Sequence, residues 1–526
     1  MIGLLYPHAG NEAGQLVLAA LRRSVSFTQA VQVSISSLDT TELNTIVAIN
    51  PTESFAEKLL AWIGKGKRKL MLFGNIPTSM AQAFGCTQTE WPAEPEHLSR
   101  SAPAPSYGQA ESAGSINYSP LARQIGGNEW RRPMERFDFT DEWNNLGFGA
   151  IRTDSSIWSL SKALNVPATN ELANLQINGV RHSSYAALFD KSEAGILWFN
   201  RPVGPIDSIE WNLIENFIAS YRHEELPCHP VLREIPWGFD AAITMRLDCD
   251  EDVESARPLL NAYRVMGIPF SLAVHTSNLV DEKHYPILRE LIATGGSVLS
   301  HTATHAPNWG GSYDAALLEG TSSANAIKNS TGIDVKYAVS PFHQSPPYAL
   351  AALADTGYQG CIGGIIRNDP EFLLARGGYL ANMPQGFIGH SQQCMLHGDC
   401  MLNEGDPLAV FKQAFDRAYE THTLFGYLDH PFSERYQYGW SDEASRIEAH
   451  RQFVAYIRSK TYNPIFLNEN DALDFLRLKS ETRIIDNGIG FKVELPAQIH
   501  NKVVDHSLAI EFKAKRFKAV ASEAFQ

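Results

Sequence analysis

Residues 244–252 read Thr-Met-Arg-Leu-Asp-Cys-Asp-Glu-Asp, and this stretch decides the fold of the region around it. It ends a largely apolar run from Phe239 to Leu247, which predicts a buried strand. Acidic residues then occupy positions 248, 250, 251 and 252. Ligands of parallel α/β folds bind at the carboxyl ends of strands. We therefore expect these carboxylates to line a functional site.

A second stretch completes this prediction. The short run Ser297-Val298-Leu299 leads into Ser300-His301-Thr302-Ala303-Thr304-His305. Two histidines four residues apart lie on one face of a helical turn, so both rings can reach one ion. An acidic cluster alone is typical of a solvated loop or a helix N-terminus, and His-x-x-x-His alone has many chance matches. Their joint occurrence after two predicted strands favours an open metal site with two histidines and one carboxylate.

Both motifs resemble those of the polysaccharide deacetylases, the NodB-like metal-dependent carbohydrate esterases. This resemblance implies that Asp248 is the general base and Asp250 a metal ligand, with Asp252 as an alternative ligand. The acidic motif is a spaced variant, because the family usually has two adjacent aspartates. His301 and His305 match the family's histidine ligands. The implied cofactor is one divalent metal, with zinc as the default and cobalt, nickel or iron as alternatives.

The family's third motif, Arg-x-Pro followed by an aromatic residue, corresponds to Val339-Ser340-Pro341-Phe342. Valine stands where the family has an arginine that orients the base. The resemblance therefore implies either a loss of activity or a substitute among Arg246, Arg367 and Arg376. It also implies that the backbone N–H of Phe342 donates to the oxyanion, a role that tolerates a side-chain change.

The last family motif, Leu-x-His, matches Leu428-Asp429-His430 after an apolar run. The resemblance makes His430 the general acid that protonates the departing amine. Histidine suits this role because its unperturbed pKa of about 6.5 makes both protonation states accessible. The acidic residue that tunes this histidine in the family has only Asp369 and Asp399 as candidates. We expect His275 to line the mouth of the site, whereas surface or hydrogen-bonded roles are favoured for His343, His390 and His397.

The length of 526 residues predicts two or three domains. Residues 1–230 alternate strand-like and helix-like segments, which predicts an open parallel α/β domain of flavodoxin- or amidotransferase-like architecture, with a flexible segment over 99–117. Residues 238–475, which carry the family resemblance, predict a distorted (β/α) barrel of NodB type. Residues 480–526 predict a small β-rich appendage.

Composition narrows the possible partners. The net charge of -14 disfavours nucleic acid and anionic membranes. Six scattered cysteines form no disulfide-like framework, and no targeting segment or membrane span is evident, so we expect a cytoplasmic protein.

The main hypothesis is an N-deacetylase that acts on an acetylated sugar in glycan biosynthesis. The alternatives are an amidase of the same superfamily that acts on a non-sugar amide, and an inactive protein that binds glycan or metal. The sequence leaves the oligomeric state open.

Overall fold

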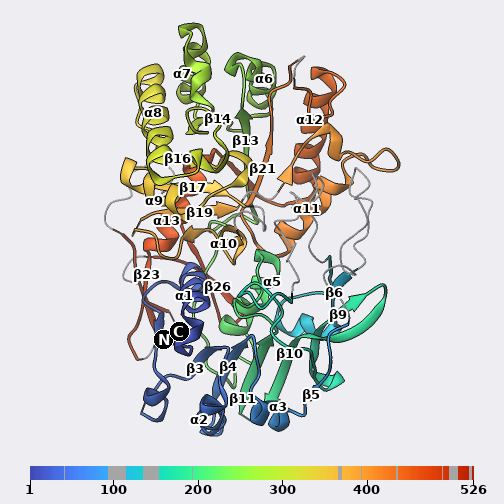
Figure 1. The fold of residues 1–526 in the computed structure, drawn as a ribbon. Coiled ribbons are helices and arrows are strands. Elements are labelled where there is room, and N and C mark those ends of the chain that lie inside the picture. Colours follow the sequence, from blue (N-terminus) through green and yellow to red (C-terminus); the bar gives the residue numbers. More distant parts are fainter. Residues whose placement is uncertain are drawn as a thin grey trace.

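The fold is an α/β arrangement in two parts, which Figure 1 shows stacked one above the other. The computed structural model describes residues 1–40, 42–92, 114–133, 153–191, 193–364, 370–384, 386–391, 394–433, 436–488, 490–496, 507–520 and 524–525. The expected α/β class is confirmed. Most of the expected flexible segment, 99–113, lies outside the described residues. Its last residues, from Gly114, belong to a strand, so the expected loop is wrong there.

The first part is built on a nine-stranded sheet with the order β2-β1-β3-β4-β11-β10-β9-β6-β7. Its strands are β1 (Ile2–Leu5), β2 (Ala30–Gln32), β3 (Thr45–Ile49), β4 (Arg68–Phe73), β6 (Gly114–Tyr118), β7 (Arg131–Pro133), β9 (Glu171–Ile177), β10 (Val180–Lys191) and β11 (Ala194–Phe199). The first five strands in this order, from β2 through β1, β3 and β4 to β11, pair in parallel, as expected. The remaining strands pair antiparallel, so the expectation of a parallel sheet is wrong for this half.

A tight turn explains the antiparallel half. Asn178 and Gly179 join β9 to β10, and both have a positive φ, of 50° and 77°. This conformation is the one that a two-residue hairpin requires, and Asn-Gly is its preferred sequence. The chain therefore returns beside itself and does not cross over through a helix.

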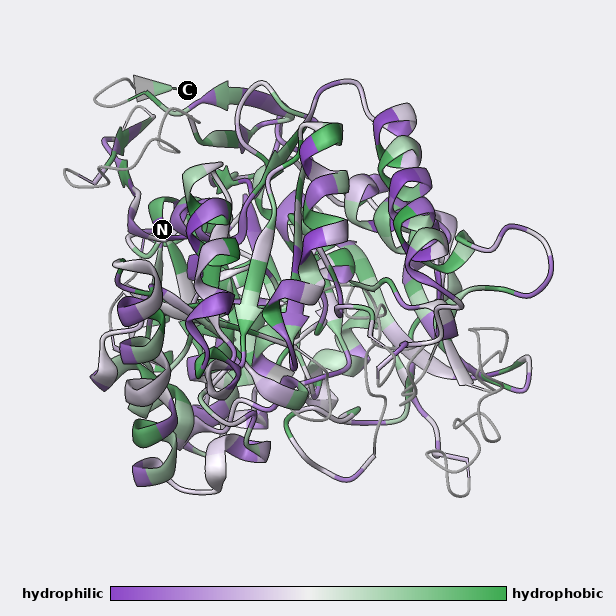
Figure 2. Ribbon diagram, turned by 90° about the horizontal axis from the view of Figure 1, so that it is seen from above, coloured by the Kyte–Doolittle hydropathy of each residue, from purple (hydrophilic) through white to green (hydrophobic). Residues whose placement is uncertain are grey.

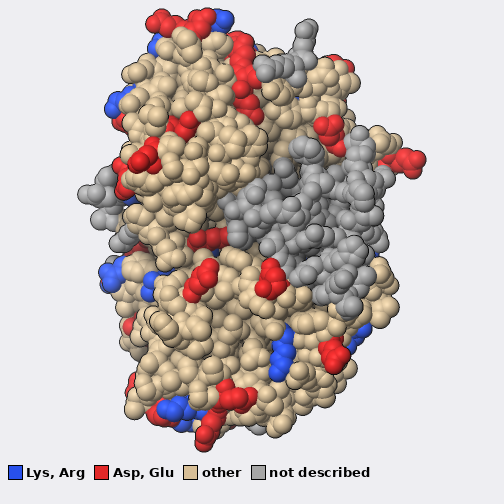
Figure 3. All heavy atoms as spheres, viewed as in Figure 1, with Lys and Arg blue, Asp and Glu red and all other residues tan. Residues whose placement is uncertain are grey.

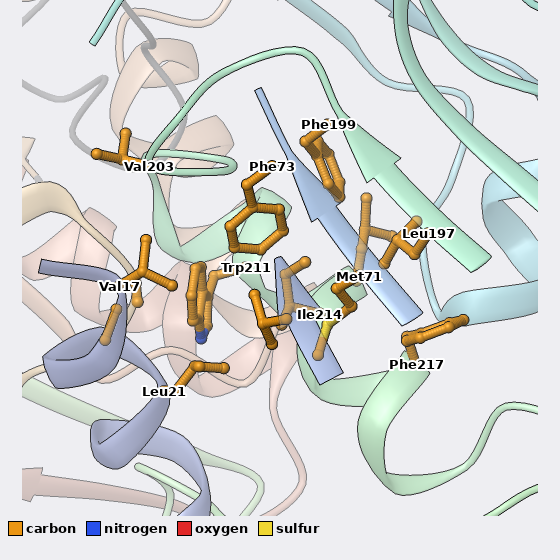
Figure 4. Packing of buried hydrophobic residues seen from close by; sticks show 14 of the residues in the cluster. Val17, Leu21, Met71, Phe73, Leu197, Phe199, Val203, Trp211, Ile214 and Phe217 are labelled. Atoms are coloured by element: carbon orange, nitrogen blue, oxygen red, sulfur yellow. The ribbon is translucent and has the colours of Figure 1, made fainter. Parts of the chain in front are cut away.

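The alternation of side chains along β4 builds a core on each face of the first sheet. Met71 and Phe73 pack with Trp211 of α5 (Ser208–Ala219) and with α1 (Asn11–Val25), as Figure 4 shows. Their neighbours along β4 face the other way, toward α2 (Glu53–Ile63) and α3 (Thr78–Phe84). Successive residues of a strand point to opposite faces, so one apolar strand supplies both cores.

The second part contains a ten-stranded sheet with the order β18-β19-β17-β16-β15-β14-β13-β21-β20, with β22 paired to β13. Its strands are β13 (Ala241–Cys249), β14 (Ser271–Val274), β15 (Ser297–Ser300), β16 (Tyr337–Val339), β17 (Gly360–Gly363), β18 (Gly378–Tyr379), β19 (Ile388–Ser391), β20 (Cys394–Met395), β21 (Phe425–Asp429) and β22 (Pro464–Leu467). All of these pairs are parallel except β18 with β19. Within the described residues no ladder joins β19 to β20, so closure of the expected barrel stays a prediction.

The longer helices of the second part pack around this sheet. They are α6 (Arg257–Met266), α7 (Tyr285–Ala293), α8 (Tyr313–Thr331), α9 (Pro347–Thr356), α11 (Ala409–Glu420), α12 (Glu443–Lys460) and α13 (Glu469–Glu481). Figure 2 shows hydrophobic residues concentrated on the central strands, whereas the surrounding helices mix hydrophilic and hydrophobic residues. Side-chain caps begin several helices: Ser312 accepts from Ala315 N at α8, and Asp442 accepts from Ser445 N at α12.

The C-terminal strands join the two parts. Strand β25 (Ala509–Phe512) forms a hairpin with β26 (Lys515–Lys518) and pairs with β12 (Val231–Leu232), which lies in the linker between α5 and β13. Strand β23 (Arg483–Asp486) begins a second small sheet, with β24 (Phe491–Glu494) and β27 (Ala524–Phe525). The Ile484 carbonyl accepts hydrogen bonds from Thr28 and Gln29 of the first part. In its described residues the C-terminal segment forms strands of two small sheets, and it packs at the junction of the two parts.

Buried charges hold this junction together. Glu215 of α5 accepts hydrogen bonds from Arg376 at 2.7 Å and 3.1 Å and from Arg233 at 2.6 Å, and all three side chains are almost fully buried. Burial raises the pKa of Glu215, but the two arginines outweigh it and lower the pKa to about 2. Arg233 also pairs with Glu511 of β25. One carboxylate thus ties together the first part, the linker and the second part.

The surface agrees with the net charge. Figure 3 shows acidic side chains spread more widely than basic ones over the face in view. No helix in the described ranges combines the length and the apolar character needed to cross a membrane.

Candidate active site

Three side chains from two strand ends converge at one point. Asp250 follows β13, and His301 and His305 follow β15, which is separated from β13 by β14 alone. Asp250 Oδ1 lies 3.4 Å from the Nε2 atoms of both His301 and His305, and these two nitrogens are 3.1 Å apart. The structure thus brings together the three residues that the sequence predicts as metal ligands.

The chemistry of these atoms fits a metal ion. In a tetrahedral zinc site with bonds of about 2.0–2.1 Å, ligand atoms lie about 3.3–3.4 Å apart. His301 Nδ1 lies 3.0 Å from the Val339 carbonyl, to which it donates a hydrogen bond. Its Nε2 therefore carries a lone pair toward the other ligands. Asp250 Oδ1 is buried and accepts no hydrogen bond from the described residues. A cation at this point would supply what these atoms lack.

The two histidines meet for a different reason from the one predicted. No helix is formed over 301–306; instead Thr302 and His305 have positive φ values of 68° and 54°. The Thr302 hydroxyl accepts a hydrogen bond from His305 N at 2.8 Å, which closes the turn. Glu319 of α8 accepts from the N–H groups of Ala303 and Thr304. The expected helical turn is wrong, and a loop held by side chains replaces it.

Arg246 is the partner of Asp248. Its Nε donates to Asp248 Oδ1 at 2.7 Å and its Nη2 donates to Oδ2 at 3.2 Å, and both side chains are almost fully buried. Burial raises the pKa of Asp248, but Arg246 and nearby histidines hold it well below its usual range. Arg246 thus supplies the contact that Val339 cannot make. Of the other substitutes considered, Arg376 binds Glu215, and position 367 lies outside the described residues.

His430 lies near the second carboxylate oxygen of Asp250, the one that does not approach His301 and His305 most closely. Its Nε2 is 3.7 Å from Asp250 Oδ2, and its Nδ1 is 2.8 Å from Nε2 of the buried His397. Asp429 Oδ1 lies 3.8 Å from His397. Burial lowers the pKa of His397 to about 3, so this ring is neutral at ordinary pH. His397 thus contacts His430 where the resemblance led us to expect an acidic residue, Asp369 or Asp399; position 369 lies outside the described residues.

A close crossing of two loops holds these rings in place. Tyr438 stacks on His430, with ring centroids 4.1 Å apart and an interplanar angle of 13°. Gly398 N donates to the Tyr438 carbonyl, and a Cβ at Gly398 would lie 2.3 Å from the backbone of Gly439. Gly439 itself has a φ of 75°. Only glycine fits at this contact, which places His397 and Tyr438 around His430.

Other predicted residues take different places. Asp252 accepts from Glu254 N and pairs with His284 at 2.8 Å, and it is not in the metal-ligand group. His275 Nδ1 lies 3.2 Å from the Asp250 carbonyl, and its expected place at the mouth of the site stays a prediction. Phe342 has a φ of 54°, is 51% exposed, and its ring centroid lies 4.6 Å from that of His305.

The contribution of Tyr438 was missed, and His397 was expected only as a surface or hydrogen-bonded histidine. These residues follow β20 and β21 at a large separation in sequence, and neither belongs to a recognisable motif. Arg246 had a usable signal, because residues i and i+2 of a strand share one face. A small pocket beside these residues is lined by Asp248, Asp250, Tyr436 and Tyr438, among others.

Comparison with known proteins gave matches at the level of structure alone. Neither the scan against protein-family models nor the search of curated proteins returned a match. Agd3, a carbohydrate deacetylase, is 10% identical, and the match covers 99% of this chain and 96% of Agd3, with a TM-score of 0.36. Puue allantoinase is 13% identical, with 46% and 92% coverage and a TM-score of 0.37. A family 4 acetyl xylan esterase from Clostridium thermocellum, in complex with a cobalt ion, is 13% identical, with 44% and 91% coverage and a TM-score of 0.30.

The solved structures to which this chain is similar include carbohydrate deacetylases and esterases, the family that its motifs resemble.

Proposed function

We propose that this protein is a metal-dependent hydrolase that removes N-acetyl groups from an acetylated sugar in glycan biosynthesis. One observation carries the proposal. The buried carboxylate of Asp248, which Arg246 holds, and the imidazole of His430 both flank the metal-ligand group of Asp250, His301 and His305. A base and an acid beside an open metal site are the parts that amide hydrolysis requires. The similar solved structures described as carbohydrate deacetylases support the same class of reaction.

Asp250, His301 and His305 would hold the metal, and zinc is the first choice. When bound, the ion would polarise the acetyl carbonyl and lower the pKa of a water molecule. These residues would supply three protein ligand atoms within 3.4 Å of one another, and catalytic zinc sites with three protein ligands keep the remaining position for water or substrate.

Asp248 would take the proton from the attacking water. Arg246 holds both of its oxygen atoms, so the carboxylate stays ionised and fixed in orientation. This contact weakens the alternative of an inactive binding protein, which rested on the missing arginine of the third motif. We propose the backbone N–H of Phe342, whose ring packs against His305, as the donor to the oxyanion.

His430 would protonate the departing amine. A protonated imidazole carries N–H on both nitrogens. Nδ1–H would then donate to Nε2 of the neutral His397, while Nε2–H faces the metal group, where it lies 3.7 Å from Asp250 Oδ2. The stacked Tyr438 ring restricts rotation of His430. The acid is thus held with one N–H directed into the site.

Exposed aromatic rings support a sugar as the substrate. Phe342 is 51% exposed and Tyr436 is 39% exposed, and Tyr436 lines the small pocket beside Asp248. Aromatic rings present an apolar face on which the C–H groups of a sugar can pack.

The six scattered cysteines, which form no disulfide-like framework, support a cytoplasmic location for this reaction.

The test measures metal content and acetate release from N-acetylated sugars for the wild type, Asp248→Asn and Asp252→Asn. Asp252 is the matched control, because it lies on the same stretch but outside the ligand group. We expect one equivalent of metal in all three proteins and loss of acetate release in Asp248→Asn alone. Turnover of a ureide such as allantoin without acetate release would favour the amidase alternative. Bound metal with no turnover of either substrate class would refute the proposed reaction.

A further inference from the structure

A second cavity lies away from the metal group. Its volume is about 380 Å³, and it is formed by α1 of the first part, by residues 379–384 of the second part, and by Ser480 of α13. No metal-ligand or catalytic candidate lines it. A volume of this size is in the range of small-molecule sites, which are often found where domains meet.

Two arginines give this cavity a positive charge. Arg22 Nε donates to the Ala30 carbonyl at 3.1 Å. Arg23 donates to the carbonyls of Tyr379 and Leu374 at 2.8 Å and 2.7 Å. These acceptors carry no formal charge. In the described part of the chain, no carboxylate lies within 4.0 Å of either guanidinium, and the buried Nε of Arg23 has no hydrogen-bond partner.

The positive charge is poorly compensated. Burial lowers the pKa of Arg22, and it lowers that of Arg23 to about 10, although Glu371 and Glu234 act on Arg23 from beyond pairing distance. The carboxyl end of α1 favours nearby cations, but this helix-dipole effect is much weaker than a counter-ion. A buried charge without a paired counter-ion destabilises the folded state. An anion from solution would remove that cost.

The rest of the lining is largely uncharged. Leu18 and Phe27 contribute apolar surface from the first part, and Leu380 contributes it from the second, while Gln15 adds an amide. Guanidinium groups recognise carboxylate and phosphate groups through directed N–H donors. The cavity therefore combines a place for one anionic group with a place for a compact uncharged body.

We propose that this cavity binds a small organic anion, whose carboxylate or phosphate pairs with Arg22 and Arg23 while its body packs against Leu18, Phe27 and Leu380. A ligand in this position contacts both parts of the chain. Its binding therefore stabilises their junction, by the mass-action effect of any ligand that binds only the folded state. The site is independent of the hydrolytic reaction.

The test uses isothermal titration calorimetry and thermal unfolding of the full-length, metal-loaded protein. The probes are glycerol 3-phosphate and glycerate, which separate a phosphate from a carboxylate, and glycerol as the neutral control. Two variants remove the site in different ways: Arg22→Gln removes one charge, and Ala19→Phe fills the cavity, which Ala19 lines. Arg451→Gln is the matched control, because Arg451 is a half-exposed arginine on α12. Asp250→Asn reports on binding at the metal group.

We expect one of the two anions, but not glycerol, to bind the wild type and raise its melting temperature. The affinity should fall at least about 10-fold in Arg22→Gln and Ala19→Phe, a loss of about 1.4 kcal/mol in binding free energy. It should be unchanged in Arg451→Gln and Asp250→Asn. Failure of both anions to bind overturns the proposal. So does anion binding that survives both cavity variants or that is lost in Asp250→Asn.

Discussion

Replacement of Arg246 by leucine tests whether this residue replaces the family arginine. The substitution leaves a carboxylate that is 4% exposed without its two donors at 2.7 Å and 3.2 Å. It also removes the positive charge 3.9 Å from the buried Glu469. Removal of one partner from a buried pair costs about 3–5 kcal/mol of stability. We expect Arg246→Leu to lose this amount near neutral pH, together with most of its acetate release.

The pKa of Asp248 determines how the loss of stability in Arg246→Leu should change with pH. The folded pKa of Asp248 lies below its unfolded value, so its stabilisation is present above the unfolded pKa and is lost as pH falls through the folded pKa. Without Arg246, burial is the largest remaining effect and is opposed only by nearby histidines, so the pKa of Asp248 rises. As the pH falls, protonation of Asp248 then removes the unpaired buried charge and so stabilises the variant. The stability difference between variant and wild type should therefore be smaller at about pH 5 than at about pH 7.5.

The assay is urea unfolding at both pH values, paired with acetate release. Arg246→Lys is the matched control, because it keeps the positive charge but loses the pair of guanidinium N–H groups that bind both carboxylate oxygens. We expect it to be intermediate in both measurements. A stability loss below about 1 kcal/mol in Arg246→Leu, with no change between the two pH values, would refute the reasoning. So would full acetate release in that variant, because Asp248 would then need no arginine.

Three further predictions concern the metal, the acid and the junction. Burial lowers the pKa of His301, but two nearby aspartates outweigh it and raise the pKa overall. A proton therefore competes with the metal, and calorimetry should show metal affinity rising from about pH 6 to about pH 8; an affinity independent of pH would contradict this. His430→Ala should slow acetate release by about 10²–10⁴-fold at unchanged metal content, and an unchanged rate would exclude the acid role. Arg376→Met should lower the free energy of unfolding by about 3–5 kcal/mol, against about 0.5 kcal/mol or less for Arg451→Met; equal losses would show that the buried pair is not needed.

The sequence predicted many of the parallel strands, because strands such as β3 and β11 are short, buried, mostly apolar runs. The antiparallel half of the first sheet was missed, although Asn178-Gly179 is a strong hairpin signal. The βαβ rhythm of the first strands favoured a parallel extension of the sheet instead. Local propensity thus predicted which elements form, but not how the second half of the sheet is connected.

The site was predictable to the extent that it follows strand ends. The spacing of His301 and His305 correctly predicted that the two rings meet, but the cause is a turn with positive φ, which the sequence does not reveal. Arg246 shares a strand face with Asp248, and its pairing could have been derived from the two-residue period. His397 and Tyr438 reach His430 only through a crossing of loops that are distant in sequence. Such contacts depend on tertiary packing.

The pairing of β25 with β12 has a consequence for synthesis of the protein. The partner of Val231 and Leu232 is made only when the ribosome has reached residue 512. Until then, Arg233 of the linker lacks its contact with Glu511. The linker therefore completes this strand pairing only after the residues of both large sheets have been synthesised. The linker would also lose this strand partner in any shortened version that stops at the end of the second sheet.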